Sequence, residues 1–157
     1  MNLEAKAAPA DHVLTLSRVF QAPREAVFRA FTDPAQVKNW FGPRGFSADV
    51  DRYDARPGGT YRMCMISPDG NALWLHGTFL MVEPHDRLSF TWIWEQGDMA
   101  GKETLVTIGF RSVGQTTEIA LRHDRLPSEA SREAHGKGWI STLDCLEDVV
   151  KQPGRAS

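Results

Sequence analysis

The sequence has little cysteine and none of the motifs that cysteine completes. It holds two cysteines, Cys64 and Cys145, and neither has a neighbouring pair of ligands at the spacing of a zinc site. Two distant thiols also provide no disulfide framework of the kind that stabilises small secreted domains. We therefore expect two buried, reduced cysteines, no bound metal and a cytoplasmic location.

Long apolar runs and an excess of basic charge are missing as well. No stretch approaches the roughly 20 apolar residues that cross a membrane, and the first ten residues lack the apolar core of a signal peptide. The formal net charge of -2 arises from interspersed signs, without the basic stripe that neutralises nucleic-acid phosphates. We expect neither membrane insertion nor a nucleic-acid partner.

Catalytic signatures are sparse. The chain has no G-x-S-x-G nucleophile elbow, no glycine-rich phosphate loop and no H-E-x-x-H motif. His76 and His123 fall in expected strands, where a ring turned inward would serve as a general acid or base, for example in an aldol-type cyclisation. A hydrogen-bonded structural histidine is the alternative for both. The sequence therefore favours a protein without enzymatic activity, and we expect no cofactor.

What the chain does contain is a continuous series of regular elements. Its 157 residues, 41% of them hydrophobic, suit one globular domain, and no internal repeat or low-complexity tract interrupts them. Composition shifts only at the two ends. We expect a flexible segment at 1–11, a single domain at 12–151 and a flexible tail at 152–157.

Hydrophobic periodicity predicts the order of these elements. Residues 12–20 alternate as a strand, and a short helix follows Pro23. A second short helix has Asp33 as its N-cap and Pro34 in its first turn. Turn chemistry then separates six strands, at about 46–55, 59–67, 71–83, 86–95, 103–112 and 115–122.

The last segment switches to a helical period. Ser128 is the candidate N-cap, and one face of the helix carries Trp139, Leu143, Leu146 and Val150. Gly136 and Gly138 each weaken a helix interior by about 1 kcal/mol relative to alanine. Their presence points to close packing or a bend beside Trp139.

The short connections and the single long helix restrict the architecture. Strands joined by tight turns form an antiparallel meander, and one long helix is available to cover its apolar face. We expect an α+β helix-grip fold in the order β-α-α-β6-α, with a seven-stranded curved antiparallel sheet wrapped around the C-terminal helix. Such a grip leaves space between sheet and helix where the two surfaces diverge.

The side chains aimed into that space are rich in methionine and aromatic rings. In "DRLSFTWIWE", Phe90, Trp92 and Trp94 share one side of the strand. Methionine and tryptophan give an adaptable lining that suits a ligand pocket, and a filled core is the alternative for each residue. The candidate ligand-binding residues are Trp40, Phe41, Met63, Met65, Trp74, Phe90, Trp92, Trp94, Val106, Ile108, Phe110, Leu121, His123, Trp139, Leu143 and Leu146.

Several stretches together carry a resemblance to a known family. They are "TLSRVFQAPREAVFRAFTDPAQVKNWFGPRGF", "RPGGTYRM", "PDG", "HDRLSFTW" and the late "GW" in "HGKGWISTLDCLEDVV". Their order and spacing resemble the SRPBCC superfamily, with its START and birch-pollen-allergen-like helix-grip fold. Within it, the chain looks like a bacterial single-domain member of the AHSA-type family, named for the activator of the ninety-kilodalton heat-shock-protein ATPase. The resemblance runs from about residue 12 to residue 150.

The resemblance implies where the aromatic residues of "NWFGP" lie and which functions are possible. Trp40 and Phe41 would lie between the two short helices and the sheet, either as a structural plug or as ligand contacts. The favoured function is binding of a hydrophobic small molecule, of the lipid, sterol or aromatic polyketide class, between sheet and helix. The alternatives are a polyketide cyclase or aromatase-like enzyme using His76 or His123, and an interaction module with a chaperone partner. A monomer and a homodimer suit the composition equally.

Overall fold

Seven strands form one antiparallel sheet, in the order β1-β7-β6-β5-β4-β3-β2. The computed structural model describes residues 12–151, so the expected end segments 1–11 and 152–157 lie outside the described residues. The strands are β1 (His12–Phe20), β2 (Ser47–Tyr53), β3 (Thr60–Ile66), β4 (Ala72–Glu83), β5 (Arg87–Trp94), β6 (Glu103–Val113) and β7 (Thr116–Leu126).

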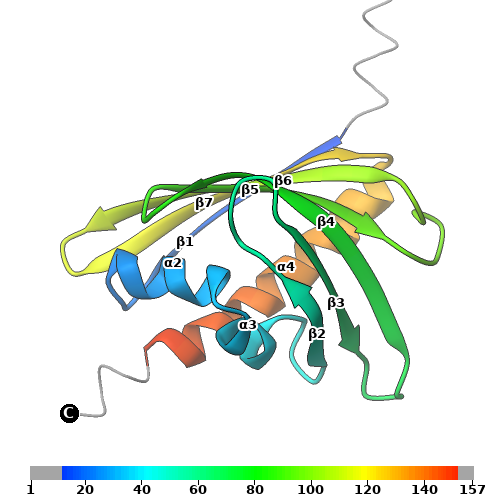
Figure 1. Ribbon diagram of the computed structural model, residues 1–157, viewed down its shortest axis with the longest axis horizontal. Coiled ribbons are helices and arrows are strands. Elements are labelled where there is room, and N and C mark those ends of the chain that lie inside the picture. The colour runs from blue at the N-terminus through cyan, green and yellow to red at the C-terminus, as the bar shows by residue number, and fades with distance from the viewer. Residues whose placement is uncertain (1–11, 152–157) are drawn as a thin grey trace, which may run out of the picture.

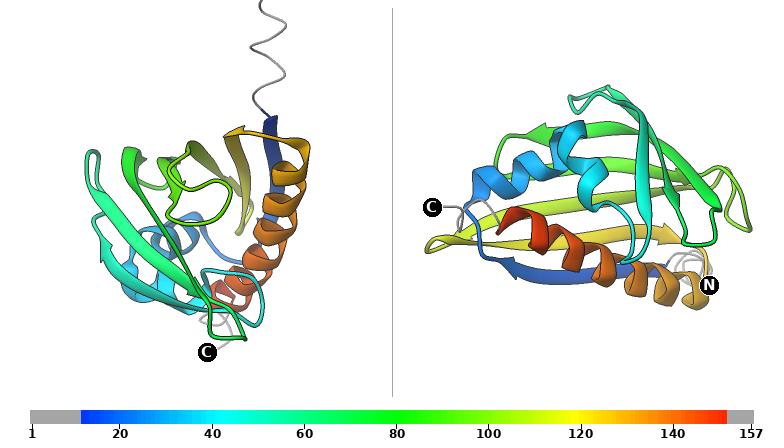
Figure 2. Two further views of the ribbon diagram at one scale, coloured as in Figure 1. Left: turned by 90° about the vertical axis from the view of Figure 1, so that its right-hand side faces the viewer. Right: turned by 90° about the horizontal axis from the view of Figure 1, so that it is seen from below.

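Three helices complete the fold and all lie on one side of the sheet (Figure 1). Two short ones, α2 (Arg24–Thr32) and α3 (Pro34–Trp40), follow β1, and the long α4 (Glu129–Val150) ends the described chain. Figure 2 shows the sheet bent around α4, with α2 and α3 at one end of the same face. This is the α+β helix-grip fold that the order of elements predicts. Among the described helices, none is both long and apolar enough to cross a membrane.

The predicted helix caps are confirmed. The Asp33 carboxylate accepts a hydrogen bond from the Ala35 amide at 3.0 Å, and Pro34 occupies the first turn of α3. At the start of α4, the Ser128 hydroxyl accepts from the Ser131 amide at 3.1 Å, while the Ser131 hydroxyl accepts from the Ser128 amide at 3.2 Å. This reciprocal pair fixes the direction in which α4 leaves β7.

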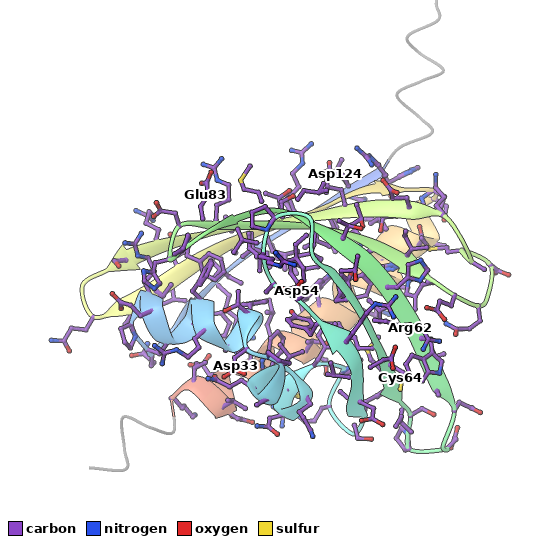
Figure 3. All side chains as sticks on the ribbon, viewed as in Figure 1. Asp33, Asp54, Arg62, Cys64, Glu83 and Asp124 are labelled. Carbon is purple, nitrogen blue, oxygen red and sulfur yellow. The ribbon has the colours of Figure 1, made fainter. Side chains whose placement is uncertain are left out.

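One strand is longer than the sequence predicts. The expected end of β7 at residue 122 is wrong, because the strand continues to Leu126. The charged stretch after Leu121 resembles a turn, yet Asp124 pairs with Leu105 of β6 and Leu126 pairs with His12 of β1. Partners on both sides hold these residues in the sheet, and Asp124 projects from the face opposite the helices (Figure 3).

A dense cluster of aromatic side chains packs on the concave face of the sheet. Tyr61 packs against Phe79 and Phe90 at centroid distances of 5.4 and 5.7 Å, and its hydroxyl donates to the Thr91 carbonyl at 2.6 Å. Gly77 lies directly beside this ring. A Cβ there would fall 2.0 Å from the Thr91 carbonyl oxygen and 2.8 Å from Tyr61 Cε2, so the strands approach this closely only because residue 77 has no side chain.

Candidate functional site

A pocket of about 210 Å³ lies between α4, the sheet and the loop that follows α3. The loop and the sheet contribute mostly aromatic and aliphatic side chains, and α4 contributes one of its faces. Its lining consists of Phe41, Pro43, Phe46, Met65, Leu73, Trp92, Trp94, Ala134, His135, Gly138, Trp139 and Thr142. None of these residues is Lys, Arg, Asp or Glu, so the pocket is an apolar site with few polar groups.

The two glycines of α4 have different surroundings. Gly136 is buried, and a Cβ at this position would lie 3.3 Å from Leu14 Cδ1 of β1, which is a tight contact. Gly138 lines the pocket, and a Cβ there would meet no atom within 4 Å. Close packing therefore explains Gly136, whereas Gly138 keeps the helical wall of the pocket free of a side chain.

Trp92 is the centre of the aromatic wall. Its ring lies 5.7 Å from Phe41 and 5.4 Å from each of Trp94, Trp139 and His123, measured between centroids. The side chain is only 5% exposed. Rings from the loop, from β5 and from α4 thus meet on one indole, which makes the wall continuous from sheet to helix.

His135 connects the helix to the sheet along this wall. Its Nε2 accepts a hydrogen bond from Trp94 Nε1 at 3.1 Å, and its Nδ1 donates to the Ser131 carbonyl at 2.7 Å. These two partners fix the neutral tautomer with the proton on Nδ1. Burial lowers the pKa of His135, which further favours the neutral ring.

His123 lies directly behind the wall and is completely buried. Its Nδ1 accepts from Trp139 Nε1 at 3.2 Å, and its Nε2 lies 2.8 Å from the Thr104 hydroxyl, which in turn donates to the Trp92 carbonyl. Burial, with a smaller effect of nearby His135, lowers the pKa of His123 to about 3. Both ring nitrogens are engaged, so His123 matches the structural alternative rather than a general acid or base.

Trp74 lies outside the pocket, contrary to the sequence prediction, and His76 lies outside it as well, hydrogen-bonded as in the structural alternative. His76 Nδ1 is 2.8 Å from Glu95 Oε2, and the same carboxylate receives two bonds of 2.9 Å from Arg62. The Arg62 guanidinium also lies 4.0 Å from the Trp74 ring centroid, and Figure 3 labels this arginine. The bonds from Arg62 and then His76 lower the pKa of Glu95 to about 2. These residues form a charged cluster on the outer face of β3 and β4.

The other candidate residues divide into two groups. Phe41, Met65, Trp92, Trp94 and Trp139 meet at the pocket. The remainder are buried in the core and do not line it, namely Trp40, Met63, Phe90, Val106, Ile108, Phe110, Leu121, Leu143 and Leu146. Trp40 is a structural plug, because its Nε1 donates to the Ala30 carbonyl at 3.0 Å and its ring packs on Phe31, while Phe41 beside it forms pocket wall.

Sequence reasoning missed part of the lining, most of it on α4. His135 and Thr142 stand four residues before and three residues after Trp139, and this helical spacing places them on the same face. Leu73 pairs with Met65 across β3 and β4, so the strand register would have identified it. Pro43 and Phe46 lie in a loop, for which periodicity gives no signal. Within residues 12–151, no cluster of three or more His, Cys, Asp or Glu side chains could hold a metal ion.

Comparison with known proteins places the chain in one family. Solved structures similar to it include a protein of Chromobacterium violaceum with 29% identity and a TM-score of 0.82, covering 88% of this chain and 96% of that one. An AHSA1 protein of Silicibacter pomeroyi has 27% identity and a TM-score of 0.80, with coverage of 89% and 98%. No curated protein matches the chain. The profile of the family described as "Activator of Hsp90 ATPase homolog 1-like protein" matches residues 21–151, and the chain therefore belongs to this family.

Proposed function

We propose that this protein binds a small hydrophobic molecule in the pocket between the sheet and α4. The observation that carries the proposal is Gly138. A glycine inside a helix lowers helix stability by about 1 kcal/mol relative to alanine, and a Cβ at this position would clash with nothing. The glycine has no packing role here, and its effect is to leave room in a pocket lined by three tryptophans.

The alternative functions have weaker support. For a cyclase-like enzyme, His123 already has partners on both nitrogens and His76 belongs to the outer cluster with Glu95 and Arg62. For a chaperone partner, the support is the name of the family alone. We also propose that the protein is cytoplasmic, because thiols such as the free Cys64 and Cys145 stay reduced in that compartment.

Substitutions at the two glycines of α4 test the proposal. Gly138→Leu extends a side chain into the pocket, so we expect at least a tenfold loss of affinity for small aromatic ligands, with a melting temperature equal to or above that of the wild type. Affinity is measured by intrinsic tryptophan fluorescence against naphthalene derivatives, a long-chain fatty acid and a sterol. Melting temperature is measured by circular dichroism.

Gly136→Ala is the matched control, because this position contacts Leu14 and not the pocket. We expect it to retain wild-type affinity. Saturable binding that survives Gly138→Leu unchanged would remove the pocket as the binding site. A wild-type protein that responds to no compound in the panel would contradict the proposed function itself.

A further inference from the structure

We propose that the ligand of this pocket is a neutral molecule of one or two rings, carrying a carbonyl or similar oxygen that accepts a hydrogen bond from the indole N–H of Trp92. This inference rests on the proposed function and adds the chemical class of the ligand. Three properties of the pocket carry it: a buried donor without a partner, a lining without charge, and a limited volume.

The donor is Trp92 Nε1. Within the described chain, this buried nitrogen has no hydrogen-bond partner. The other tryptophans of this region are satisfied, since Trp40 donates to Ala30, Trp94 to His135 and Trp139 to His123. A buried donor left without an acceptor costs about 1–3 kcal/mol, and nearly all buried polar groups avoid that penalty. An acceptor on the ligand would remove it.

The residue that carries this donor lines the pocket, although the nitrogen itself is buried. Neighbouring atoms cover the Trp92 nitrogen, so the indole must move before an oxygen of a ligand can reach it. Gly138 lines the same pocket, and the absence of a Cβ there leaves space for a ligand. The missing side chain leaves room in the pocket, and the unsatisfied donor would supply a hydrogen bond to a ligand oxygen there.

The surroundings favour a neutral ligand. The lining holds no Lys or Arg, and the acceptor nitrogen of His135 is already taken by Trp94. An unpaired carboxylate or phosphate moved into such a site would lose its hydration without compensation. A cation would meet aromatic faces but no carboxylate, and it could not accept a hydrogen bond from Trp92.

Volume sets the size of the ligand. The pocket measures about 210 Å³. A dry cavity of about 150 Å³ holds a benzene molecule, whereas sites for drug-sized ligands begin at about 300 Å³. One ring or two fused rings with a short substituent fit between these limits. A sterol or a four-ring polyketide would require the sheet and α4 to move apart.

A matched pair of probes tests whether an acceptor oxygen on the ligand raises its affinity. 2-Acetylnaphthalene and 2-isopropenylnaphthalene have nearly the same shape, and only the first has an oxygen. We expect the ketone to bind about three- to tenfold more tightly, the range given by one net hydrogen bond. In spectra of ¹⁵N-labelled protein, the Trp92 indole N–H resonance should move downfield with the ketone and not with the hydrocarbon. 2-Naphthoate should bind at least tenfold more weakly than the ketone.

Two variants assign the effect to a single donor. Trp92→Phe should reduce the ketone-to-hydrocarbon affinity ratio to about one while the hydrocarbon still binds. Trp94→Phe should preserve the ratio, because the Trp94 N–H already donates to His135. Equal binding of ketone and hydrocarbon by the wild type, without a Trp92 shift, would overturn this inference and leave the proposed function intact. Failure of every probe to bind would overturn both.

Discussion

Gly77→Ala is expected to lower the free energy of unfolding by about 3 kcal/mol, the upper range for overpacking a core. The added methyl would stand 2.0 Å from the backbone oxygen of Thr91 and 2.8 Å from the Tyr61 ring. Neither neighbour can move freely, because Tyr61 is held by its bond to that same oxygen and by Phe79 and Phe90. Urea denaturation followed by circular dichroism measures the loss, and the melting temperature should fall by roughly 10 °C.

Gly109→Ala provides the matched control for this prediction. Gly109 also lies within a strand, β6, but a Cβ there would meet nothing within 4 Å. We expect its stability to stay within about 0.5 kcal/mol of the wild type. Equal stability of the two variants would contradict the view that close approach of β4 to β5 and Tyr61 requires the glycine.

The second large effect is a loss of stability in mild acid. The pKa of His123 is about 3 in the folded protein and about 6.5 in an unfolded chain, so between these values the unfolded state binds the additional proton. Stability from this group is complete above pH 6.5 and falls as the pH drops toward 3. The slope approaches 1.4 kcal/mol per pH unit, and the loss between pH 7 and pH 5 should be about 2 kcal/mol. The lowered pKa of His135 acts in the same direction.

Chemical denaturation at several pH values measures this loss of stability. A variant without the His123 imidazole tests whether His123 causes it. His123→Gln keeps polar atoms near Trp139 and Thr104 but does not titrate, so the loss between pH 7 and pH 5 should shrink by about 2 kcal/mol. His85→Asn is the control, since His85 occupies a turn with a φ of 68°, which asparagine tolerates. It should retain the full loss. An unchanged slope in His123→Gln would show that other groups cause the acid sensitivity.

Sequence reasoning succeeded where side-chain alternation alone decides the outcome. The alternation in β5 placed Phe90, Trp92 and Trp94 on the concave face, and they lie there. Alternation does not show which part of that face stays open. Phe110 faces inward like Trp92, but Phe28 and Phe31 of α2 cover it at 5.2 and 5.7 Å, and it belongs to the core. The open region depends on the paths of α2, α3 and α4, which are tertiary properties.

His76 and His123, the two candidate histidines in strands, show a second limit of prediction from sequence. Leu73 and Leu75 share one side of the strand, so alternation places His76 on the other side, facing outward. That signal was present in the sequence. His123 does face inward, but its bonds to Trp139 and Thr104 join residues from α4 and β6. No local pattern predicts that an inward histidine will be fully buried, and so kept neutral, among partners so distant in the chain.

The position of β1 in the sheet has a consequence for the order of folding. β2 to β7 are connected by short turns and pair with their neighbours in sequence, whereas β1 pairs with β7, with Phe20 opposite Thr117 and Leu16 opposite Leu121. Closing such a long loop is entropically costly, and contacts between distant residues form slowly. The meander should therefore assemble first, and β1 should join it only after β7 is in place. Because α4 follows β7 and supplies one wall of the pocket, we expect the pocket to form only after β7 has joined the sheet.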